Sequence, residues 1–299
     1  MTRTRQRAFR PGLDDLEGRQ LLTLVGTTVA ETSFSAPAIT TFHNDLFIAW
    51  RGTDDRINVE DLDTQAKRTL NETTSAAPAL AVYNNRLVVA WTGTDGPHHL
   101  NVESSSNGLN FDVTTRNTLT QTTFASDGPA LAAYGGSLVI AWTGTDTNLN
   151  DAFSRDGKNF GSANTFGSYY GATSQDAPAL TTLNGDLYVA WTGTDTRLNY
   201  LDLRTSQKTI LRAGGQFPHS NNAPSLASNG NQLYLAWTGT DQTGRQDQLN
   251  VIDATTGVQV PPTFDSSFDG PSLAFGPGGT RYIAWSGTDA FTLVNYAVV

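Results

Sequence analysis

Carboxylates recur at two fixed places along this chain, and both could do chemistry. One set ends a Gly-Thr-Asp triplet that follows a tryptophan, at Asp54, Asp95, Asp146, Asp195, Asp241 and Asp289. A second set stands two residues before a proline, at Asp127, Asp176 and Asp269. Carboxylates gathered without cations either bind Ca²⁺ or Mg²⁺ or acquire raised pKa values. The same side chains also form ordinary turns by accepting backbone N–H groups, so both interpretations stay open.

Other reactive side chains form no recognisable constellation. The histidines are His43, His98, His99 and His219, and none has the spacing of a paired metal or catalytic motif. The absence of cysteine excludes disulfides and thiolate metal sites. The nucleophile elbow, the phosphate-binding loop and the dinucleotide-binding glycine motif are also missing. The residue types therefore favour binding over catalysis.

An internal repeat sets the elements that must position these carboxylates. The hexapeptide AWTGTD begins at Ala90, Ala141, Ala190 and Ala236, and returns with one substitution at Ala49 and Ala284. All six tryptophans belong to it and stand 41 to 51 residues apart. That interval is the length of a four-stranded propeller blade.

Each unit has the same internal order. A proline opens an apolar strand, a polar turn leads into an alternating strand that ends at the tryptophan, and the Gly-Thr-Asp turn follows. A third strand then begins with Ile/Leu-Asn, and a Thr-rich fourth strand completes the unit. Short strands joined by tight turns form an antiparallel meander. Such sheets must stack around an axis, because one sheet alone cannot bury both of its faces.

The sequence therefore predicts an all-β fold, a six-bladed β-propeller with four-stranded antiparallel blades. The last unit has no fourth strand of its own. We expect a strand from residues 21–30 to complete the last blade and close the ring. The expected organisation is an N-terminal targeting or flexible segment over residues 1–20 and a propeller over residues 21–299.

Most residues of the AWTGTD hexapeptide have a structural interpretation. Each tryptophan is expected to pack between neighbouring sheets, where it buries a large area. The triplet glycines are expected to supply positive φ angles; they are Gly52, Gly93, Gly144, Gly193, Gly239 and Gly287. Each triplet aspartate is expected to accept N–H groups across its own turn.

A functional interpretation remains for the same polar turns. If all six emerge on one rim, their aspartates form repeated shallow sites for a polar ligand such as a glycan. The asparagines of the third strands would lie beside them, at Asn58, Asn101, Asn150, Asn199 and Asn250. The first strand of a blade lines the central channel, so Asp127, Asp176 and Asp269 would meet at its mouth. There they are the candidate metal ligands for Ca²⁺, and no other cofactor is expected.

The charge balance narrows the range of partners. The formal net charge is −9, with 28 acidic against 19 basic residues. A body this acidic is a poor partner for nucleic acid or anionic lipid. No apolar run approaches the roughly 18 residues that a membrane helix needs, so membrane insertion is not expected.

Two strand-to-strand hairpins carry a family resemblance. The stretches Ser105–Phe111 and Ser154–Phe160 read SSNGLNF and SRDGKNF, and they resemble a shortened form of the Asp-box of sialidase-like propellers. In that family the box is structural. The resemblance also implies a catalytic set of three arginines, a tyrosine with a glutamate, and an acidic residue. The arginines in this repeat are few and scattered, for example Arg51, Arg86 and Arg197.

The Gly-Thr-Asp turn resembles a turn of bacterial and tectonin-type propeller lectins, which bind sugars at shallow pockets between blades. At the chain start, Leu16-Glu17-Gly18-Arg19-Gln20-Leu21-Leu22 resembles the Leu-Glu-x-Arg-x-Leu-Leu motif of predicted extracellular proteins of planctomycete-type bacteria. That resemblance implies export or association with the envelope.

Taken together, the residues and resemblances predict a non-catalytic, secreted or cell-surface binding module. Its expected partner is a glycan or polysaccharide, and its expected location is extracellular or in the cell envelope. Two alternatives stay open. One is a sialidase-like glycoside hydrolase, which would require residues from several blades to converge on one site. The other is a scaffold that binds another protein.

Overall fold

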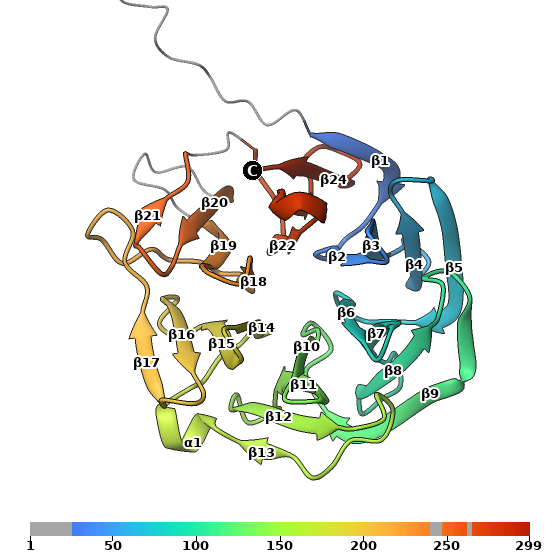
Figure 1. Ribbon diagram of the computed structural model, residues 1–299, viewed down its shortest axis with the longest axis horizontal. Coiled ribbons are helices and arrows are strands. Elements are labelled where there is room, and N and C mark those ends of the chain that lie inside the picture. Colours follow the sequence, from blue (N-terminus) through green and yellow to red (C-terminus); the bar gives the residue numbers. More distant parts are fainter. Residues whose placement is uncertain (1–25, 240–246, 262–264) are drawn as a thin grey trace, which may run out of the picture.

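A computed structural model describes residues 26–239, 247–261 and 265–299. These residues form a ring of six sheets around a central opening (Figure 1). The first strand of every blade lies nearest the axis and contacts the first strands of both neighbouring blades. The expected six-bladed β-propeller is therefore confirmed. The predicted segment 1–20, its Leu-Glu-x-Arg motif and the aspartate Asp241 lie outside the described residues.

Each blade is a sheet of four antiparallel strands, and the first five blades take their strands in chain order. Blades 1 and 2 contain β2 (Ala38–Phe42), β3 (Asp45–Arg51), β4 (Arg56–Asp61) and β5 (Ala66–Thr73), then β6 (Ala79–Tyr83), β7 (Arg86–Thr92), β8 (His99–Ser105) and β9 (Phe111–Thr122). Blades 3 and 4 contain β10 (Ala130–Tyr134), β11 (Ser137–Thr143), β12 (Leu149–Ser154) and β13 (Asn164–Thr165), then β14 (Ala179–Leu183), β15 (Asp186–Thr192), β16 (Leu198–Asp202) and β17 (Gln207–Ile210). Blade 5 contains β18 (Ser225–Ser228), β19 (Leu233–Gly239), β20 (Gln248–Asp253) and β21 (Val258–Gln259).

Blade 6 draws its strands from both ends of the described chain. Its three inner strands are β22 (Ser272–Phe275), β23 (Arg281–Ser286) and β24 (Leu293–Val298), and its outer strand is β1 (Thr27–Thr32). The antiparallel register joins Thr27 to Tyr296 and Val29 to Val294, and Figure 1 shows β1 along the outside of β24. The predicted closure of the ring by an N-terminal strand is confirmed.

A hydrophobic cluster fills every junction between blades, and each cluster contains one tryptophan. At the junction of blades 2 and 3, for example, Trp142 belongs to one cluster with Val88 and Leu100. The other five clusters contain Trp91, Trp191, Trp237, Trp285 and Trp50. The six indoles are only 0–4% exposed. The prediction that they pack between sheets is confirmed.

The two ends of the ring differ in how their loops are built. At one end, hairpins join the third and fourth strands and are closed by their own side chains. In blade 3, Asp156 Oδ1 accepts the N–H groups of Lys158 and Asn159 at 2.9 and 2.7 Å, and Ser154 donates its hydroxyl to the same oxygen at 2.8 Å. The opposite end holds the Gly-Thr-Asp turns and the loops that lead from one blade into the next. We call this opposite end the mouth face.

Among the residues that the structure describes, helical structure is confined to connections. The helix α1 (Gly167–Tyr170) lies between β13 and β14, and a 3₁₀ turn at Pro277–Gly279 joins β22 to β23. Within the described ranges, no helix has the length and apolar character needed to cross a membrane.

Replacing Val29 with Asp should weaken closure of the ring. Val29 is 7% exposed and packs in the cluster of Trp50 between blades 6 and 1. A carboxylate placed there loses apolar burial and lacks a partner, so we expect a loss of about 2–4 kcal/mol in the free energy of unfolding. The matched control is Ala30→Asp on the exposed side of β1, which should stay within about 0.5 kcal/mol of the parent. Urea unfolding measures both, and equal losses would contradict the role of Val29.

Candidate functional site

A cavity of about 580 Å³ lies at the centre of the mouth face. A repeated position contributes to its lining: the residue two places before each strand-opening proline. These six residues, which we call the mouth ring, are Ser35, Ala76, Asp127, Asp176, Asn222 and Asp269. The three aspartates predicted from the sequence are therefore brought into one cavity, as their common place in the repeat requires.

Hydroxyl groups next to the tryptophans hold the backbone of the mouth ring. In blades 2, 3, 4 and 6, the residue after the tryptophan reaches across to the loop that leaves its blade and donates its hydroxyl to the carbonyl of the ring residue there. The four bonds of this type join Thr92 to Asp127 at 2.6 Å, Thr143 to Asp176 at 2.5 Å, Thr192 to Asn222 at 2.7 Å and Ser286 to Ser35 at 2.7 Å. We call them the latches. The same hexapeptide that wedges the blades together thus also fixes the mouth ring.

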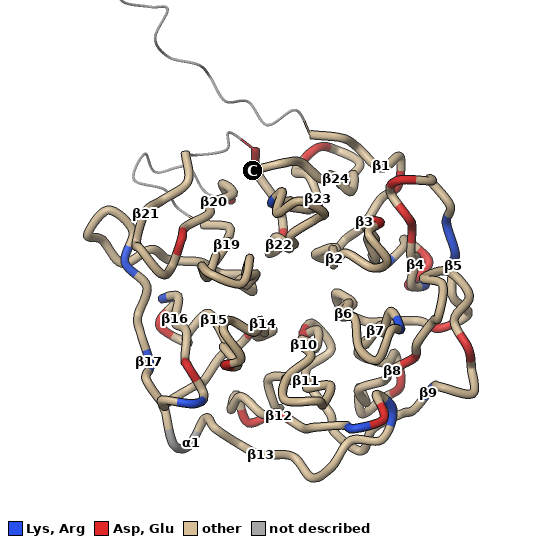
Figure 2. Tube along the Cα trace, in the orientation of Figure 1, with Lys and Arg blue, Asp and Glu red and all other residues tan. Residues whose placement is uncertain are grey.

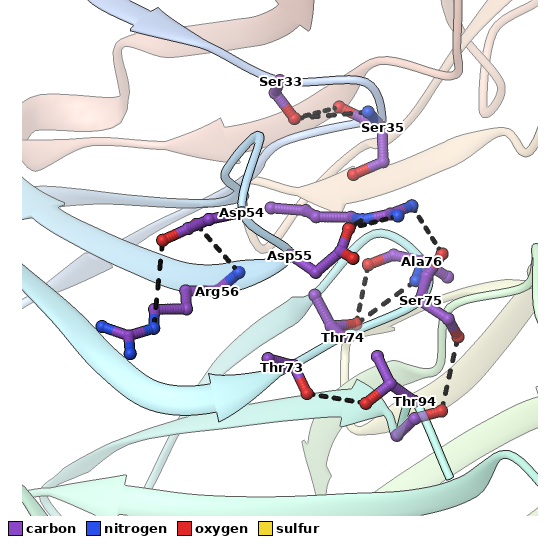
Figure 3. Close-up of polar contacts among 12 residues, drawn as sticks. Ser33, Ser35, Asp54, Asp55, Arg56, Thr73, Thr74, Ser75, Ala76 and Thr94 are labelled. Carbon is purple, nitrogen blue, oxygen red and sulfur yellow. Dashed lines mark hydrogen bonds and ion pairs between the residues drawn. The ribbon is translucent and has the colours of Figure 1, made fainter. Parts of the chain in front are cut away.

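Buried hydroxyls inside the loops give further support. Thr74 accepts the N–H of Ala76 at 3.3 Å and donates to its carbonyl at 2.8 Å (Figure 3). Ser33 holds Ser35 in the same way, and Figure 3 shows both pairs. These hydroxyls were not predicted from the sequence. A Ser or Thr four residues before five of the six strand-opening prolines was the available signal.

Blade 1 replaces the latch hydroxyl by an arginine. Arg51 donates through Nη1 to the Ser75 carbonyl at 2.7 Å and through Nε to Asp55 Oδ1 at 2.8 Å. Its Nη2 also lies 2.5 Å from Asp55 Oδ1. The guanidinium is therefore committed to Asp55 and to the loop. It is the one basic residue in the described lining of the cavity.

The three ring aspartates have different hydrogen-bond partners. Asp269 accepts the N–H of Gly270 at 2.7 Å and that of Ala36, in the loop entering the next blade, at 2.8 Å. Asp176 accepts the N–H of Ala177 at 2.8 Å. Asp127 accepts only the hydroxyl of Ser126, through Oδ1 at 2.8 Å, and its Oδ2 is buried without a partner.

Burial raises the pKa values of all three ring aspartates, and repulsion between carboxylates adds to the shifts of Asp127 and Asp176. Burial raises the pKa of Asp127 to about 6, the Ser126 hydroxyl opposes that rise, and the negative charge of Asp269 adds to it. Burial raises the pKa of Asp176 well above its usual range, with repulsion from Asp269 and Asp127 as further causes. Burial also raises the pKa of Asp269, although its two amide donors oppose the shift. Repulsion from Asp269 therefore contributes to the raised pKa values of both Asp127 and Asp176.

The positions of Asp127, Asp176 and Asp269 can be compared with what a Ca²⁺ site requires. Ca²⁺ requires six to eight oxygen ligands around one point. Among the described residues, no group of three or more His, Asp or Glu side chains is placed to hold one metal ion. The three aspartates line one cavity without forming a coordination sphere, and the Ca²⁺ site stays a prediction.

The Gly-Thr-Asp turns of blades 1, 2, 3, 4 and 6, which the structure describes, lie around the ring, outside the mouth cavity. Their aspartates accept N–H groups across their own turn, as expected. Asp54 Oδ1 takes the N–H of Arg56 at 3.1 Å (Figure 3), and Asp146 Oδ1 takes that of Asn148 at 3.1 Å. Asp95, Asp195 and Asp289 bond in the same way. The Asp54 and Asp195 side chains are more than half exposed, so these carboxylates remain open to solvent on the rim.

The prediction of positive φ at the triplet glycines is wrong. Gly52, Gly93, Gly144, Gly193, Gly239 and Gly287 are not among the residues with positive φ. In three of the turns the left-handed residue lies three positions later, at Asp55, Thr147 and Thr196. Glycine is needed because side chains approach closely. A Cβ on Gly144 would lie 2.7 Å from Asp146 Oδ1 and 2.8 Å from Asn150 Nδ2.

The third-strand asparagines are buried inside their blades. Asn150, for example, donates through Nδ2 to the Asn148 carbonyl at 2.8 Å, and its Oδ1 accepts the hydroxyl of Thr165 at 2.6 Å. Each of the others likewise donates its Nδ2 to a carbonyl of its own blade; they are Asn58, Asn101, Asn199 and Asn250. These bonds explain the Asn of the repeat structurally. A direct role of these asparagines in ligand binding stays a prediction.

The mouth face also carries exposed phenylalanines that were not predicted from the sequence. Phe34 lines the cavity and is 67% exposed. Phe124 and Phe268 are also exposed, in the loops that enter blades 3 and 6. No repeat pattern marks them, because only some of the loops carry one. The mouth face therefore combines aromatic rings with hydrogen-bonding side chains.

Comparison with known proteins identifies the architecture. The SapL1 lectin in complex with α-methyl fucoside is 14% identical over 90% of this chain and 94% of its own, with a TM-score of 0.61. A variant of the Aleuria aurantia lectin in complex with Fucα1-6GlcNAc is 11% identical over 91% of this chain and 97% of its own, with a TM-score of 0.57. Trypanosoma rangeli sialidase is 14% identical over 89% of this chain, with a TM-score of 0.55.

These likenesses show the fold. The chain spans about half the length of the sialidase, 53%, but nearly all of each lectin. No protein-family model and no curated protein matches the sequence.

Replacing Asp127 with Asn should stabilise the protein at neutral pH. The folded state holds the Asp127 proton more tightly than the unfolded chain does, so its stabilising effect is full at low pH and is lost as the pH rises through about 6. Removing the ionised group should add about 1–3 kcal/mol to the free energy of unfolding at pH 7.5, and less at pH 5. Denaturant unfolding at the two pH values measures the difference.

The control is Asp45→Asn, at the first residue of β3 and at the far end of the ring. It should change the stability by less than about 0.5 kcal/mol at either pH. An Asp127→Asn protein that is less stable than the parent at pH 7.5 would show that the ionised carboxylate is a structural support.

Proposed function

We propose that this chain is a non-catalytic carbohydrate-binding propeller whose principal site is the mouth cavity. The observation that carries the proposal is the cavity itself, about 580 Å³ in volume and lined by Ser, Asn, Gln and Asp side chains. That volume falls within the range of roughly 300–1,000 Å³ of small-molecule sites. Sugar hydroxyls both donate and accept hydrogen bonds, so this mixed polar lining suits them.

The exposed phenylalanines support a sugar ligand. Phe34 stands in the cavity lining, and Phe268 is 58% exposed in a neighbouring loop. Single exposed apolar residues need no explanation, but here they share the face that carries the cavity. A flat aromatic ring offers a large apolar surface at little entropic cost, and the apolar face of a pyranose can stack on it.

The comparisons favour a lectin over a hydrolase. Two solved lectins in complex with fucosides match this chain over 94% and 97% of their length, whereas the sialidase extends far beyond it. The sialidase-like alternative would also need a cluster of arginines to bind a carboxylate. In the described lining of the mouth cavity, Arg51 is the one arginine and is paired with Asp55.

We infer that the Gly-Thr-Asp turns provide weaker additional sites. Their exposed aspartates stand beside donor side chains: Asp54 next to Arg56, Asp146 next to Asn148 and Asp195 next to Arg197. A carboxylate beside a donor can bind two neighbouring hydroxyls of a sugar. Several copies on one molecule would raise the avidity for a polysaccharide.

We also propose that the protein acts outside the cell or in the envelope, because the motif at residues 16–22 resembles that of exported proteins. Fractionation of bacteria that express the full chain tests this. Recovery from the cytoplasm alone would contradict it.

Binding to a glycan array, followed by calorimetry on the strongest ligand, tests the carbohydrate function. We expect about one strong site per chain. Phe34→Ala should weaken it about tenfold, or about 1.4 kcal/mol, by removing a stacking surface. Phe291→Ala, an equally exposed ring on the blade 6 turn, should leave the strong site unchanged.

The other outcomes separate the alternatives. If calorimetry finds several equal sites, and Phe291→Ala weakens binding while Phe34→Ala does not, the sugar binds at the Gly-Thr-Asp turns instead of in the mouth cavity. No binding to any glycan would overturn the proposal. Hydrolysis of fluorogenic glycosides that is lost in Asp127→Asn would make the protein an enzyme.

A further inference from the structure

Two buried polar atoms of the mouth ring have no hydrogen-bond partner. They are Ser35 Oγ and Asp127 Oδ2, and their residues are only 5% and 1% exposed. Buried polar groups are normally paired, and leaving one unpaired costs free energy. Both residues line the mouth cavity. Figure 3 shows that Ser33 bonds the backbone of Ser35, so the Ser35 hydroxyl is left over. A ligand in the cavity would satisfy both atoms.

The charged residues that line the mouth cavity indicate which sign of charge the ligand carries. The charged residues that line the cavity are Asp127, Asp176, Asp269 and Arg51. Arg51 is neutralised by Asp55. Three carboxylates thus share one cavity without an opposing cation among the described residues. Positive charge brought by a ligand would be attracted by all three.

The three aspartates of the mouth ring differ in the hydrogen-bond donors that the protein itself supplies to their carboxylates. Backbone N–H groups stabilise the carboxylates of Asp176 and Asp269, whereas Asp127 has one neutral hydroxyl donor. Asp127 is therefore the carboxylate that gains most from a cationic donor. Asp176 and Asp269 supply a surrounding negative potential.

The arrangement favours an organic cation over a metal ion. Because the described carboxylates do not converge on one point, no single metal ion can collect them. A ligand that carries one ammonium group and several hydroxyls distributes its donors over a wider area. The exposed ring of Phe34 beside these groups suits a sugar face.

We propose that the mouth cavity selects amino sugars with a free ammonium group, of the hexosamine class. This inference rests on the proposed carbohydrate function and specifies its ligand. The ammonium group binds Asp127, and hydroxyls of the same residue bond Ser35 and Asn222. N-acetylation removes the charge and enlarges the group, so neutral acetylated counterparts bind less well.

Acid should weaken this recognition. The pKa of Asp127 is raised to about 6 by burial, and repulsion from Asp269 contributes. Below that pH the carboxyl is neutral and no longer attracts a cation. The pKa values of Asp176 and Asp269 are shifted in the same direction, and the paired charges of Arg51 and Asp55 lie at the edge of the same cavity.

The test compares glucosamine trisaccharide with N-acetylglucosamine trisaccharide by calorimetry on the full chain. At pH 7 we expect the free amine form to bind at least tenfold more tightly, and the preference should fall several-fold at pH 5. Asp127→Asn should reduce the preference to about twofold or less. Asp45→Asn, at the opposite end of the ring, should retain it. Thermal unfolding of each variant shows whether it is folded.

The remaining outcomes are distinct. Equal affinities for the two trisaccharides, or tight binding of other neutral sugars only, would overturn the amino-sugar proposal and leave the carbohydrate function standing. Failure of every glycan on the array would remove both. Displacement of the glucosamine trisaccharide by Ca²⁺ at millimolar concentration, with a rise in the melting temperature, would replace the amine site by a metal site.

Discussion

The packing of one tryptophan into each junction between blades is the interaction on which the rest of the structure depends. A four-stranded sheet has two faces to bury, and here each face is covered only by the neighbouring blade. The indoles fill that space at all six junctions. The last junction forms because β1 completes blade 6, so that Val29 lies in the same cluster as Trp50. With the ring closed, every blade packs against a neighbouring blade on both of its faces.

The motif that builds the junctions also builds the mouth. The hydroxyl after the tryptophan latches the mouth ring, the glycine makes room for the asparagine of the third strand, and the aspartate closes the turn. Each of these contacts engages backbone or residues of the repeat itself. Side chains at the ring positions are therefore free to differ, and they do: Ser, Ala, Asp, Asp, Asn and Asp stand there. A uniform scaffold thus carries one asymmetric cavity. Figure 2 shows that Asp and Glu positions are distributed around the whole ring.

The sequence was informative where a feature repeats. Strand order and the buried tryptophans follow from the period and the patterning, because both recur in all six blades. The blade number follows from the count of repeats, and the closing strand follows from the outer strand that the last repeat lacks. It was misleading where one residue can serve two purposes. Gly144 was expected to provide a turn conformation, yet it is required by the approach of Asn150 and Asp146. Contacts such as the latch of Thr143 to Asp176 join residues 33 positions apart, and no local pattern announces them. The unpaired state of Asp127 Oδ2 likewise depends on the packing of several loops.

The three aspartates of the mouth ring lower the stability of the folded protein. Ala76 and Asn222 occupy the same position in other blades, so the fold does not require a carboxylate there. Yet three are present. Burial raises the pKa values of all three, and repulsion adds to the shifts of Asp127 and Asp176. Ionising them at neutral pH therefore opposes folding. Buried groups that lower stability without serving the fold are typical of binding sites, where a ligand supplies the missing partner. All three side chains line the mouth cavity, which is where the proposed cationic ligand would bind.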